Sequence, residues 1–307
     1  MYNTRLEASN RRVCRMKTSI FQTLEMLQLT STETRSVFNR RTRDVDGLIV
    51  WKDDVSGVIY IDDFYTGNET YIDGSYREEK HSSTGTLDYE SFIDAQRRFD
   101  RNLQYVAGKR VVDFGCGAGD FLRLAQSHCA NVCGIELQKN YADALNSDGI
   151  SCVSDIDDIE DNSIDVCLSF HVIEHLPNPL DILSSLKRKL VKGGTLVVEV
   201  PHANDFLLAN AANEDFKQFT LWSQHLVLHT RDSLQRMLSN VGFNEVLIEG
   251  VQRYPLSNHL NWLINGKAGG HKSALSSIDT LSLREAYSNS LSKINATDTL
   301  VAIAKVL

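Results

Sequence analysis

Residues 111–122 read VVDFGCGAGDFL, and this stretch decides the expected fold. A short apolar run ends at Asp113, glycines then stand at positions 115, 117 and 119, and apolar residues at helical spacing follow. This order predicts a strand, a tight loop and a helix. Glycine lets a ligand lie against bare main chain, where the first amides of the helix point at an anion. The loop is therefore a candidate ligand-binding loop.

The glycine spacing separates two kinds of nucleotide site. A dinucleotide-binding loop has the pattern G-x-G-x-x-G, but counting from Gly115 the sixth position is Asp120. Read from Asp113, the loop instead resembles the first motif of class I methyltransferases, which use S-adenosylmethionine (SAM). The resemblance implies that the methionine end of SAM lies along the loop. The residues expected to contact it are Asp113, Gly115, Cys116, Gly117 and Gly119.

The ends of the following apolar runs supply the rest of the expected cofactor site. The run 132–135 ends at Glu136, whose carboxylate can accept hydrogen bonds from both ribose hydroxyls of a nucleoside. Asp155 and Ile156 match the family's adenine pocket, in which the acidic side chain faces the exocyclic amine and the apolar one flanks the ring. Three neighbours of these strand ends complete the expected set: Leu137, Ser169 and Phe170.

The resemblance covers about residues 88 to 250 and the last apolar run, 300–304. It implies an α/β fold: a Rossmann-like, seven-stranded, mostly parallel sheet with one antiparallel strand and helices on both faces. We expect this methyltransferase domain to span 88–307 and to carry an insertion at 255–296.

Residues 1–87 are expected to form an N-terminal extension. Apolar spacing between 17 and 42 predicts two short helices, and two β-rich runs around the turn 53–57 predict a hairpin. The segment 65–86 is either a lid over the cofactor or a plain polar linker.

Composition narrows the class of protein. The chain has 307 residues, and 42% of them are hydrophobic, which is enough for a full core. Its six cysteines are scattered and include no C-x-x-C pair, which suggests that the thiols are reduced. No apolar run approaches the length of a transmembrane segment, and the N-terminus lacks the apolar core of a signal peptide, so we expect a cytoplasmic protein. The net charge of −8 makes nucleic acid an unlikely partner.

The charge is uneven, because residues 1–43 hold nine basic and three acidic side chains. This basic arm could contact an anionic partner, although a solvated helix face or a disordered tail is the favoured interpretation. The sequence assigns no oligomeric state.

Histidines gather on the expected acceptor side. His171, Glu174 and His175 are spaced to share one face of a short helix. With His225 they resemble the E-x-x-E-H plus distant His arrangement of small-RNA 2'-O-methyltransferases and ubiquinone-pathway O-methyltransferases. That resemblance implies a divalent metal held by His171, Glu174, His175 and His225. Three imidazoles and one carboxylate suit zinc, iron or manganese better than magnesium.

A metal-free alternative uses the same residues. In metal-free methyltransferases the Glu-His pair holds the loop after the fourth strand, and a histidine at the position of His225 acts alone as the base. Both alternatives stay open at this stage. The catalytic candidates are His225, His171 and His175.

Methyl transfer requires alignment of donor and acceptor, and removal of a proton when the acceptor is a hydroxyl. The resemblance to ubiquinone-pathway and sugar O-methyltransferases implies a small-molecule or glycan acceptor, such as a hydroxyl of a sugar or polysaccharide precursor. A metal-dependent RNA-end 2'-O-methyltransferase is one alternative, favoured by the histidine cluster and the basic arm. A SAM-binding partner protein without catalysis is another.

Overall fold

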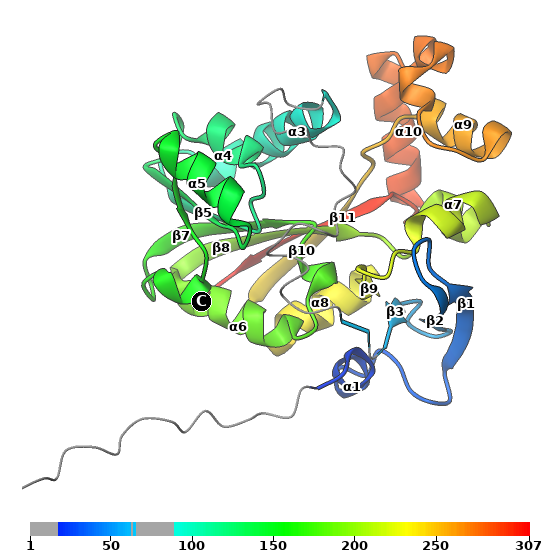
Figure 1. The fold of residues 1–307 in the computed structure, drawn as a ribbon, viewed down its shortest axis with the longest axis horizontal. Helices are drawn as coiled ribbons and strands as arrows, with labels where there is room; N and C mark the ends of the chain where they lie inside the picture. Colours follow the sequence, from blue (N-terminus) through cyan, green and yellow to red (C-terminus); the bar gives the residue numbers. More distant parts are fainter. Residues whose placement is uncertain (1–17, 63, 66–88) are drawn as a thin grey trace, which may run out of the picture.

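The computed structural model describes residues 18–62, 64–65 and 89–307. Apart from Tyr65, the expected lid lies almost wholly outside the described residues, as does the first part of the basic arm. Figure 1 shows a central sheet between two layers of helices, with a smaller sheet beside it. The helix α1 (Ile20–Met26) lies on one side of the small sheet, and a helical insertion lies on the other side.

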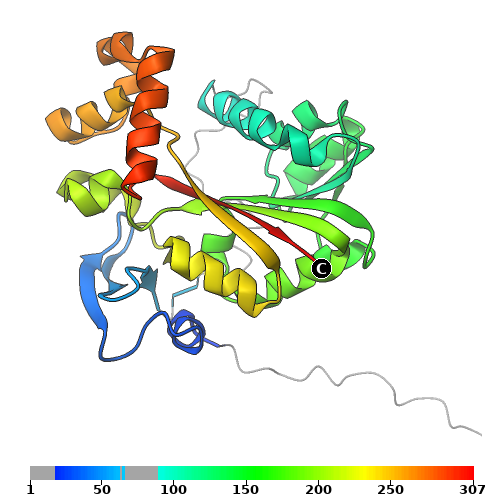
Figure 2. The ribbon, with the colours of Figure 1, turned by 180° about the vertical axis from the view of Figure 1, so that it is seen from behind.

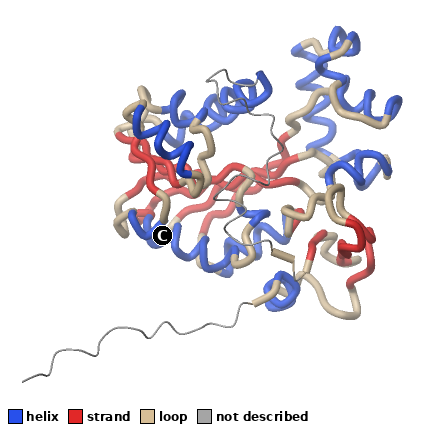
Figure 3. The backbone as a smooth tube through the Cα atoms, viewed as in Figure 1, coloured by secondary structure: helices blue, strands red, loops and turns tan. Residues whose placement is uncertain are grey.

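The central sheet has seven strands in the order β10-β11-β8-β7-β4-β5-β6. Figure 3 shows its strands in red among the blue helices. All neighbouring pairs are parallel except the two made by β11, which runs antiparallel to β8 and β10. The strands are β4 (Arg110–Phe114), β5 (Asn131–Ile135), β6 (Ser151–Val153), β7 (Ile164–Phe170), β8 (Leu190–Pro201), β10 (Asn244–Val251) and β11 (Thr299–Lys305). The predicted seven-stranded, mostly parallel sheet is confirmed.

Helices cover both faces because the strands alternate apolar residues to the two sides. Along β4, Val111 packs in one buried cluster and Val112 in another. In Figure 1, one face carries α3 (Tyr89–Val106), α4 (Asp120–Ala125) and α5 (Lys139–Ser147). The other face carries α6 (Pro179–Lys189) and α8 (Arg231–Asn240).

The N-terminal extension forms a helix and most of a second sheet. After α1 (Ile20–Met26), the sheet has the order β1-β2-β3-β9. Its strands are β1 (Arg35–Arg41), β2 (Asp46–Asp53), β3 (Ile59–Ile61) and β9 (Val227–Leu228). The predicted hairpin is confirmed, since β2 and β3 pair antiparallel.

The prediction of a second N-terminal helix is wrong, because Arg35–Arg41 forms the strand β1. Pairing with β2 supplies its backbone partners, and the Arg35 guanidinium lies over the rings of Phe21 and Trp51, at 4.3 and 4.4 Å from their centroids. Cross-strand pairing and a cation–π contact thus override the local apolar spacing.

The segment between β10 and β11 is helical. It contains α9 (Leu256–Asn265), two short 3-10 turns, Gly270–Lys272 and Ala274–Ile278, and α10 (Leu281–Lys293). Figure 2 shows that this insertion and α3 rise on the same side of the central sheet. A further helix, α7 (Glu214–Thr220), precedes β9. Within the described ranges, every helix is too short or too polar to cross a membrane.

Candidate active site

The glycine loop joins β4 to α4 through backbone angles that favour glycine. Gly115 has φ +76°, and a Cβ atom there would lie 2.4 Å from Cγ2 of Val172. Gly119 has φ +77°, and a Cβ atom there would lie 2.3 Å from Cδ2 of Leu145. The loop can therefore pass this close to its neighbours only without side chains at these two positions.

Glu136 follows β5 and is buried against the glycine loop. Its two carboxylate oxygens accept hydrogen bonds from the backbone amides of Gly117, at 2.7 Å, and Gln138, at 2.9 Å. A carboxylate has about four lone-pair positions, so each oxygen can accept another bond. Asp155 caps the short 3-10 turn Ile156–Asp158 by accepting from the amide of Asp157, at 2.9 Å.

Two adjoining cavities lie over the carboxyl ends of the central strands. The larger, of about 720 Å³, collects nine of the predicted residues: Gly115, Glu136, Leu137, Asp155, Ile156, Phe170, His171, His175 and His225. The smaller, of about 500 Å³, is lined by Asp113, Gly115 and Cys116 among others. Arg98, Gly115, Phe170 and Arg253 line both cavities.

Three predicted cofactor residues, Gly117, Gly119 and Ser169, line neither cavity. Gly117 acts through its amide, which holds Glu136, and Gly119 begins α4. Asp113 lines the smaller cavity with its Oδ1 atom buried and without a hydrogen-bond partner among the described residues. Burial raises the pKa of Asp113 to about 7. An unpaired buried oxygen of this kind suits a ligand that brings a donor.

Glu174, His175 and His225 form one cluster, with ligand atoms that all lie within 4.8 Å of one another. His175 Nδ1 lies 2.8 Å from the carbonyl oxygen of Gln224. Because a carbonyl only accepts, Nδ1 donates, and the neutral ring keeps its lone pair on Nε2. The ring centroids of His175 and His225 are 5.0 Å apart.

His225 is held in an electrically neutral state. Burial, reinforced by the neighbouring His175, lowers the pKa of His225 to about 3. Its Nδ1 atom is buried and has no hydrogen-bond partner in the part of the chain that the structure describes. The ring of Trp222 lies edge-on, with a centroid distance of 5.2 Å. This histidine therefore carries an unused polar atom beside a cavity.

His171 contacts the cluster through Glu174 but does not lie on the short helix, contrary to its predicted position on a shared helical face. The short helix spans Ile173–His175, and His171 precedes it with φ +56°. Its Nδ1 atom lies 3.1 Å from Glu174 Oε1, and its Nε2 atom lies 3.3 Å from Glu199 Oε1 and 3.1 Å from a guanidinium nitrogen of Arg253. Both ring nitrogens are thus occupied by protein neighbours.

The pKa values of this pair move in opposite directions. Burial and Arg253 act to lower the pKa of His171, but the hydrogen bonds to Glu174 and Glu199 outweigh them and raise it. Burial acts to raise the pKa of Glu174, but His171 and His175 lower it to about 2.

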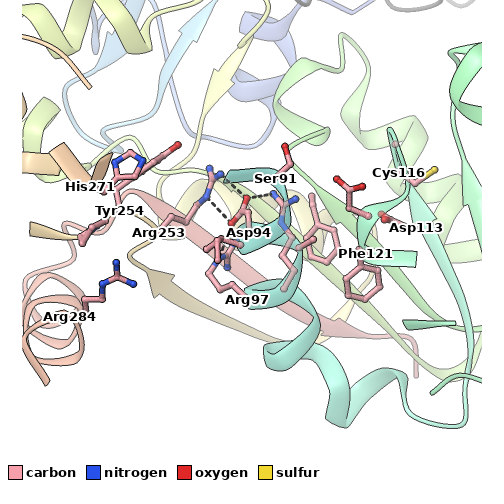
Figure 4. Close-up of a pocket in the computed structure, with 17 residues that line it drawn as sticks. Ser91, Asp94, Arg97, Asp113, Cys116, Phe121, Arg253, Tyr254, His271 and Arg284 are labelled. Atoms are coloured by element: carbon pink, nitrogen blue, oxygen red, sulfur yellow. Dashed lines mark hydrogen bonds and ion pairs between the residues drawn. The ribbon is translucent and has the colours of Figure 1, made fainter. Parts of the chain in front are cut away.

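A charged network that the sequence did not reveal lies at the smaller cavity (Figure 4), and two of its members, Arg98 and Arg253, line both cavities. Asp94 on α3 lies 2.7 Å from Arg253, 2.8 Å from Arg97 and 3.1 Å from Arg98. Glu199 on β8 lies 2.7 Å from Arg97 and 3.0 Å from Arg98. The only sequence signal is Glu199, a charge inside an apolar strand.

These contacts hold both acids ionised. Burial acts to raise the pKa of Asp94, but Arg253, Arg98 and Arg97 lower it to about 2. Burial likewise acts to raise the pKa of Glu199. Arg98, together with the other partners of Glu199, nevertheless lowers the pKa of this carboxyl well below its ordinary value.

Comparison with known protein families finds one model that matches residues 90–248, described as a methyltransferase domain. That match covers half of the chain. Among solved structures, a SAM-dependent methyltransferase from Archaeoglobus fulgidus is similar in fold, with a TM-score of 0.50 and 20% sequence identity over 70% of this chain and 94% of that one.

Curated relatives match about half of the chain. A ubiquinone biosynthesis O-methyltransferase of Cupriavidus pinatubonensis is 29% identical over 167 residues, which cover 50% of this chain and 67% of the relative. A phosphoethanolamine N-methyltransferase of Triticum aestivum is 24% identical over 192 residues, which cover 55% of this chain and 37% of the relative.

The charged network makes a prediction for stability. Asp94→Asn leaves three guanidinium groups without the charge that they share, so we expect the free energy of unfolding to fall by about 3 kcal/mol near neutral pH, measured by urea denaturation. Because the folded-state pKa of Asp94 is about 2, below its ordinary 3.8, its contribution is full above about pH 4 and is lost as the pH falls through 2. The difference between wild type and variant should shrink over that range.

Asp143→Asn is the matched control, because the bridge from Asp143 to Lys139 is exposed to solvent and lies within one helix. We expect it to change the free energy of unfolding by less than about 0.5 kcal/mol. Equal losses in the two variants would contradict a stabilising role for the network.

Proposed function

The chain belongs to the methyltransferase domain family and is a SAM-dependent methyltransferase, and from this premise we propose that it methylates a hydroxyl of a small-molecule or glycan acceptor. A sugar or polysaccharide precursor is the acceptor we favour. The observation that carries the proposal is the larger cavity, which joins Glu136 and Asp155 to His175 and His225 in one space. The O-methyltransferase name of the Cupriavidus relative supports oxygen as the accepting atom.

The residues around the glycine loop fit the cofactor. We propose that Glu136 and Asp155 bind its ribose and adenine, and that the loop from Gly115 to Gly119 lies along its methionine end. The unpaired oxygen of Asp113 is available to the amino group. When bound, SAM supplies an electrophilic methyl group. The protein's own part is to align the acceptor and to take up its proton.

We propose His225 as the general base. Its low pKa leaves the imidazole unprotonated near neutral pH but also makes the ring a weak base, so proton uptake from an acceptor hydroxyl depends on a negative charge beside the ring. Glu174 lies beside it and would stabilise the imidazolium that forms, because its own pKa of about 2 keeps it ionised. His171 acts as a positioning residue in this scheme, since it orients Glu174.

A metal-assisted reaction is the second candidate, and the Glu174, His175 and His225 cluster favours it. Two imidazoles and one carboxylate form a ligand set that zinc accepts while keeping an open position. The bond from His175 Nδ1 to Gln224 fixes the tautomer that leaves Nε2 available to a metal. His171 is outside this proposed set, because Glu199 and Arg253 occupy its outer nitrogen.

We propose that the enzyme works in the cytoplasm. The support is its cysteine usage, since all five cysteines that the structure describes are unpaired: Cys116, Cys129, Cys133, Cys152 and Cys167. Unpaired, largely buried thiols are typical of reducing compartments.

The cofactor assignment predicts the effect of a methyl group on the glycine loop. Gly115→Ala should weaken binding of S-adenosylhomocysteine (SAH) by about tenfold or more, measured by calorimetry, because the new Cβ meets Val172 and displaces the loop. Gly149→Ala is the matched control: its φ of +78° imposes the same backbone strain, but nothing lies within 4 Å of the added atom. Equal affinities would show that the loop does not contact the cofactor.

The proposed base predicts a selective loss of turnover. His225→Ala should reduce methyl transfer by about 100-fold or more and leave SAH affinity nearly unchanged, because the imidazole acts on the acceptor. The wild type is first assayed with labelled SAM and four kinds of candidate acceptor: nucleotide sugars, catechols, phosphoethanolamine and an RNA oligonucleotide. The compound that it methylates is then used as the substrate to measure turnover of the variants. His128→Ala, at an exposed histidine, is the control. Turnover retained in His225→Ala would exclude His225 as the base.

Metal binding separates the two candidates. If the cluster holds a metal, calorimetry with Zn²⁺ or Mn²⁺ should detect one site in the wild type that is lost in both His175→Ala and Glu174→Gln. The proton-transfer mechanism with His225 alone predicts no such site. This measurement needs no acceptor, so it stands apart from the turnover assay.

A further inference from the structure

We infer that the smaller cavity contains an anion-binding subsite at the end formed by the insertion, and that the methyl acceptor carries a phosphate or carboxylate group bound there. The inference rests on the proposed function, and it names the chemical class of acceptor that this site takes. The residues that form the subsite are Arg284 and His271 of the insertion, with Arg97 of α3.

The smaller cavity has two chemically different ends (Figure 4). Asp113, Cys116 and Phe121 lie at the glycine-loop end, and Asp120, which precedes Phe121 in the chain, also lines the cavity. Tyr254, His271 and Arg284 lie at the opposite end, where the insertion closes the cavity. The glycine-loop end therefore carries a carboxyl group, and the insertion end carries a guanidinium and an imidazole. A ligand with a negative group is attracted to the insertion end.

Arg284 is a cation without a partner in the structure. It lies on α10, and its guanidinium makes no hydrogen bond or ion pair with any residue of the described ranges. A guanidinium on a helix surface is normally hydrated, so it needs no protein partner. Here it lines a cavity, so a phosphate or carboxylate could form a bidentate, charge-assisted contact with it.

The inner wall of the cavity also offers a donor to an anion. Three guanidinium groups, of Arg97, Arg98 and Arg253, share the carboxylates of Asp94 and Glu199. The Nη1 atom of Arg97 is buried and has no hydrogen-bond partner among the described residues. Buried donors of this kind are rarely left unpaired, and an anionic oxygen would satisfy it.

The position of the subsite favours the acceptor over the cofactor as the source of the anion. The proposed cofactor lies along the glycine loop, at the end where Asp113 lies. The insertion end is on the far side of Arg97. An acceptor bound there by its anionic group can extend toward Gly115 and Phe170, where the two cavities adjoin.

Calorimetry on the full chain tests the subsite with inorganic phosphate as the probe. The protein is first saturated with SAH, whose affinity is recorded for every variant, and phosphate is then titrated. We expect the wild-type complex to bind phosphate and Arg284→Gln to bind it about tenfold more weakly, because one charge-assisted contact is lost. Arg284 is exposed, so the substitution leaves the packing of α10 unchanged.

Lys293→Gln is the matched control, since it removes an exposed cation from the same helix that does not line the cavity. Its phosphate affinity should equal that of the wild type. A parallel titration with acetate distinguishes a phosphate subsite from a carboxylate one, and binding of either ion that depends on Arg284 supports the inference.

Three results would overturn it: no binding of either ion to the wild type, equal binding by Arg284→Gln, or competition between phosphate and SAH, which would assign the subsite to the cofactor's own carboxylate. Failure of the protein to bind SAH would instead count against the proposed function. In that event the same titration on the cofactor-free protein still decides whether the subsite exists.

Discussion

Parallel pairing of β4 with β5 and β7 is the constraint on which the site depends. The carboxyl ends of parallel strands meet at one edge of a sheet, so residues that follow different strands are collected there. Asp113, Glu136 and His171 reach the cavities in this way, although they are far apart in sequence. The glycine loop lets this edge close tightly, because Gly115 approaches Val172 too closely for any side chain.

The charged network then links this edge to two other parts of the fold. Asp94 belongs to α3, Glu199 to β8, and Arg253 to the segment that leads from β10 into the insertion. Burial of these charges carries a desolvation cost, which their mutual contacts offset. Of the side chains in this network, Arg98 and Arg253 line both cavities. The network therefore fixes the position of the insertion and sets the electrostatic character of the space beside it.

Features that depend on a local pattern of residues could be predicted from the sequence. Features that depend on contacts between distant segments could not. Strand ends such as Glu136 and Asp155 could be identified because each follows a short apolar run of its own. The strand Arg35–Arg41 could not, because its partner β2 and the rings around Arg35 come from other segments. Arg253 had no local signal, since only the fold brings it to Asp94. His171 was assigned to a helical face by spacing alone, but it precedes the short helix with a left-handed backbone and meets the cluster through Glu174.

The acceptor side of the site is built largely by segments outside the central sheet. His225 and Trp222 lie just before β9, which pairs with β3 of the N-terminal extension through Ile59 and Leu228. The carboxylate of Asp44 accepts from the backbone amide of Ser223, at 3.0 Å, and the Arg43 guanidinium lies 4.5 Å from the ring centroid of Trp222. The extension thus holds the segment that carries the proposed base, while the insertion closes the other cavity. Because the sheet fixes the proposed cofactor residues, we expect acceptor specificity to change through these two additions without loss of the proposed cofactor site.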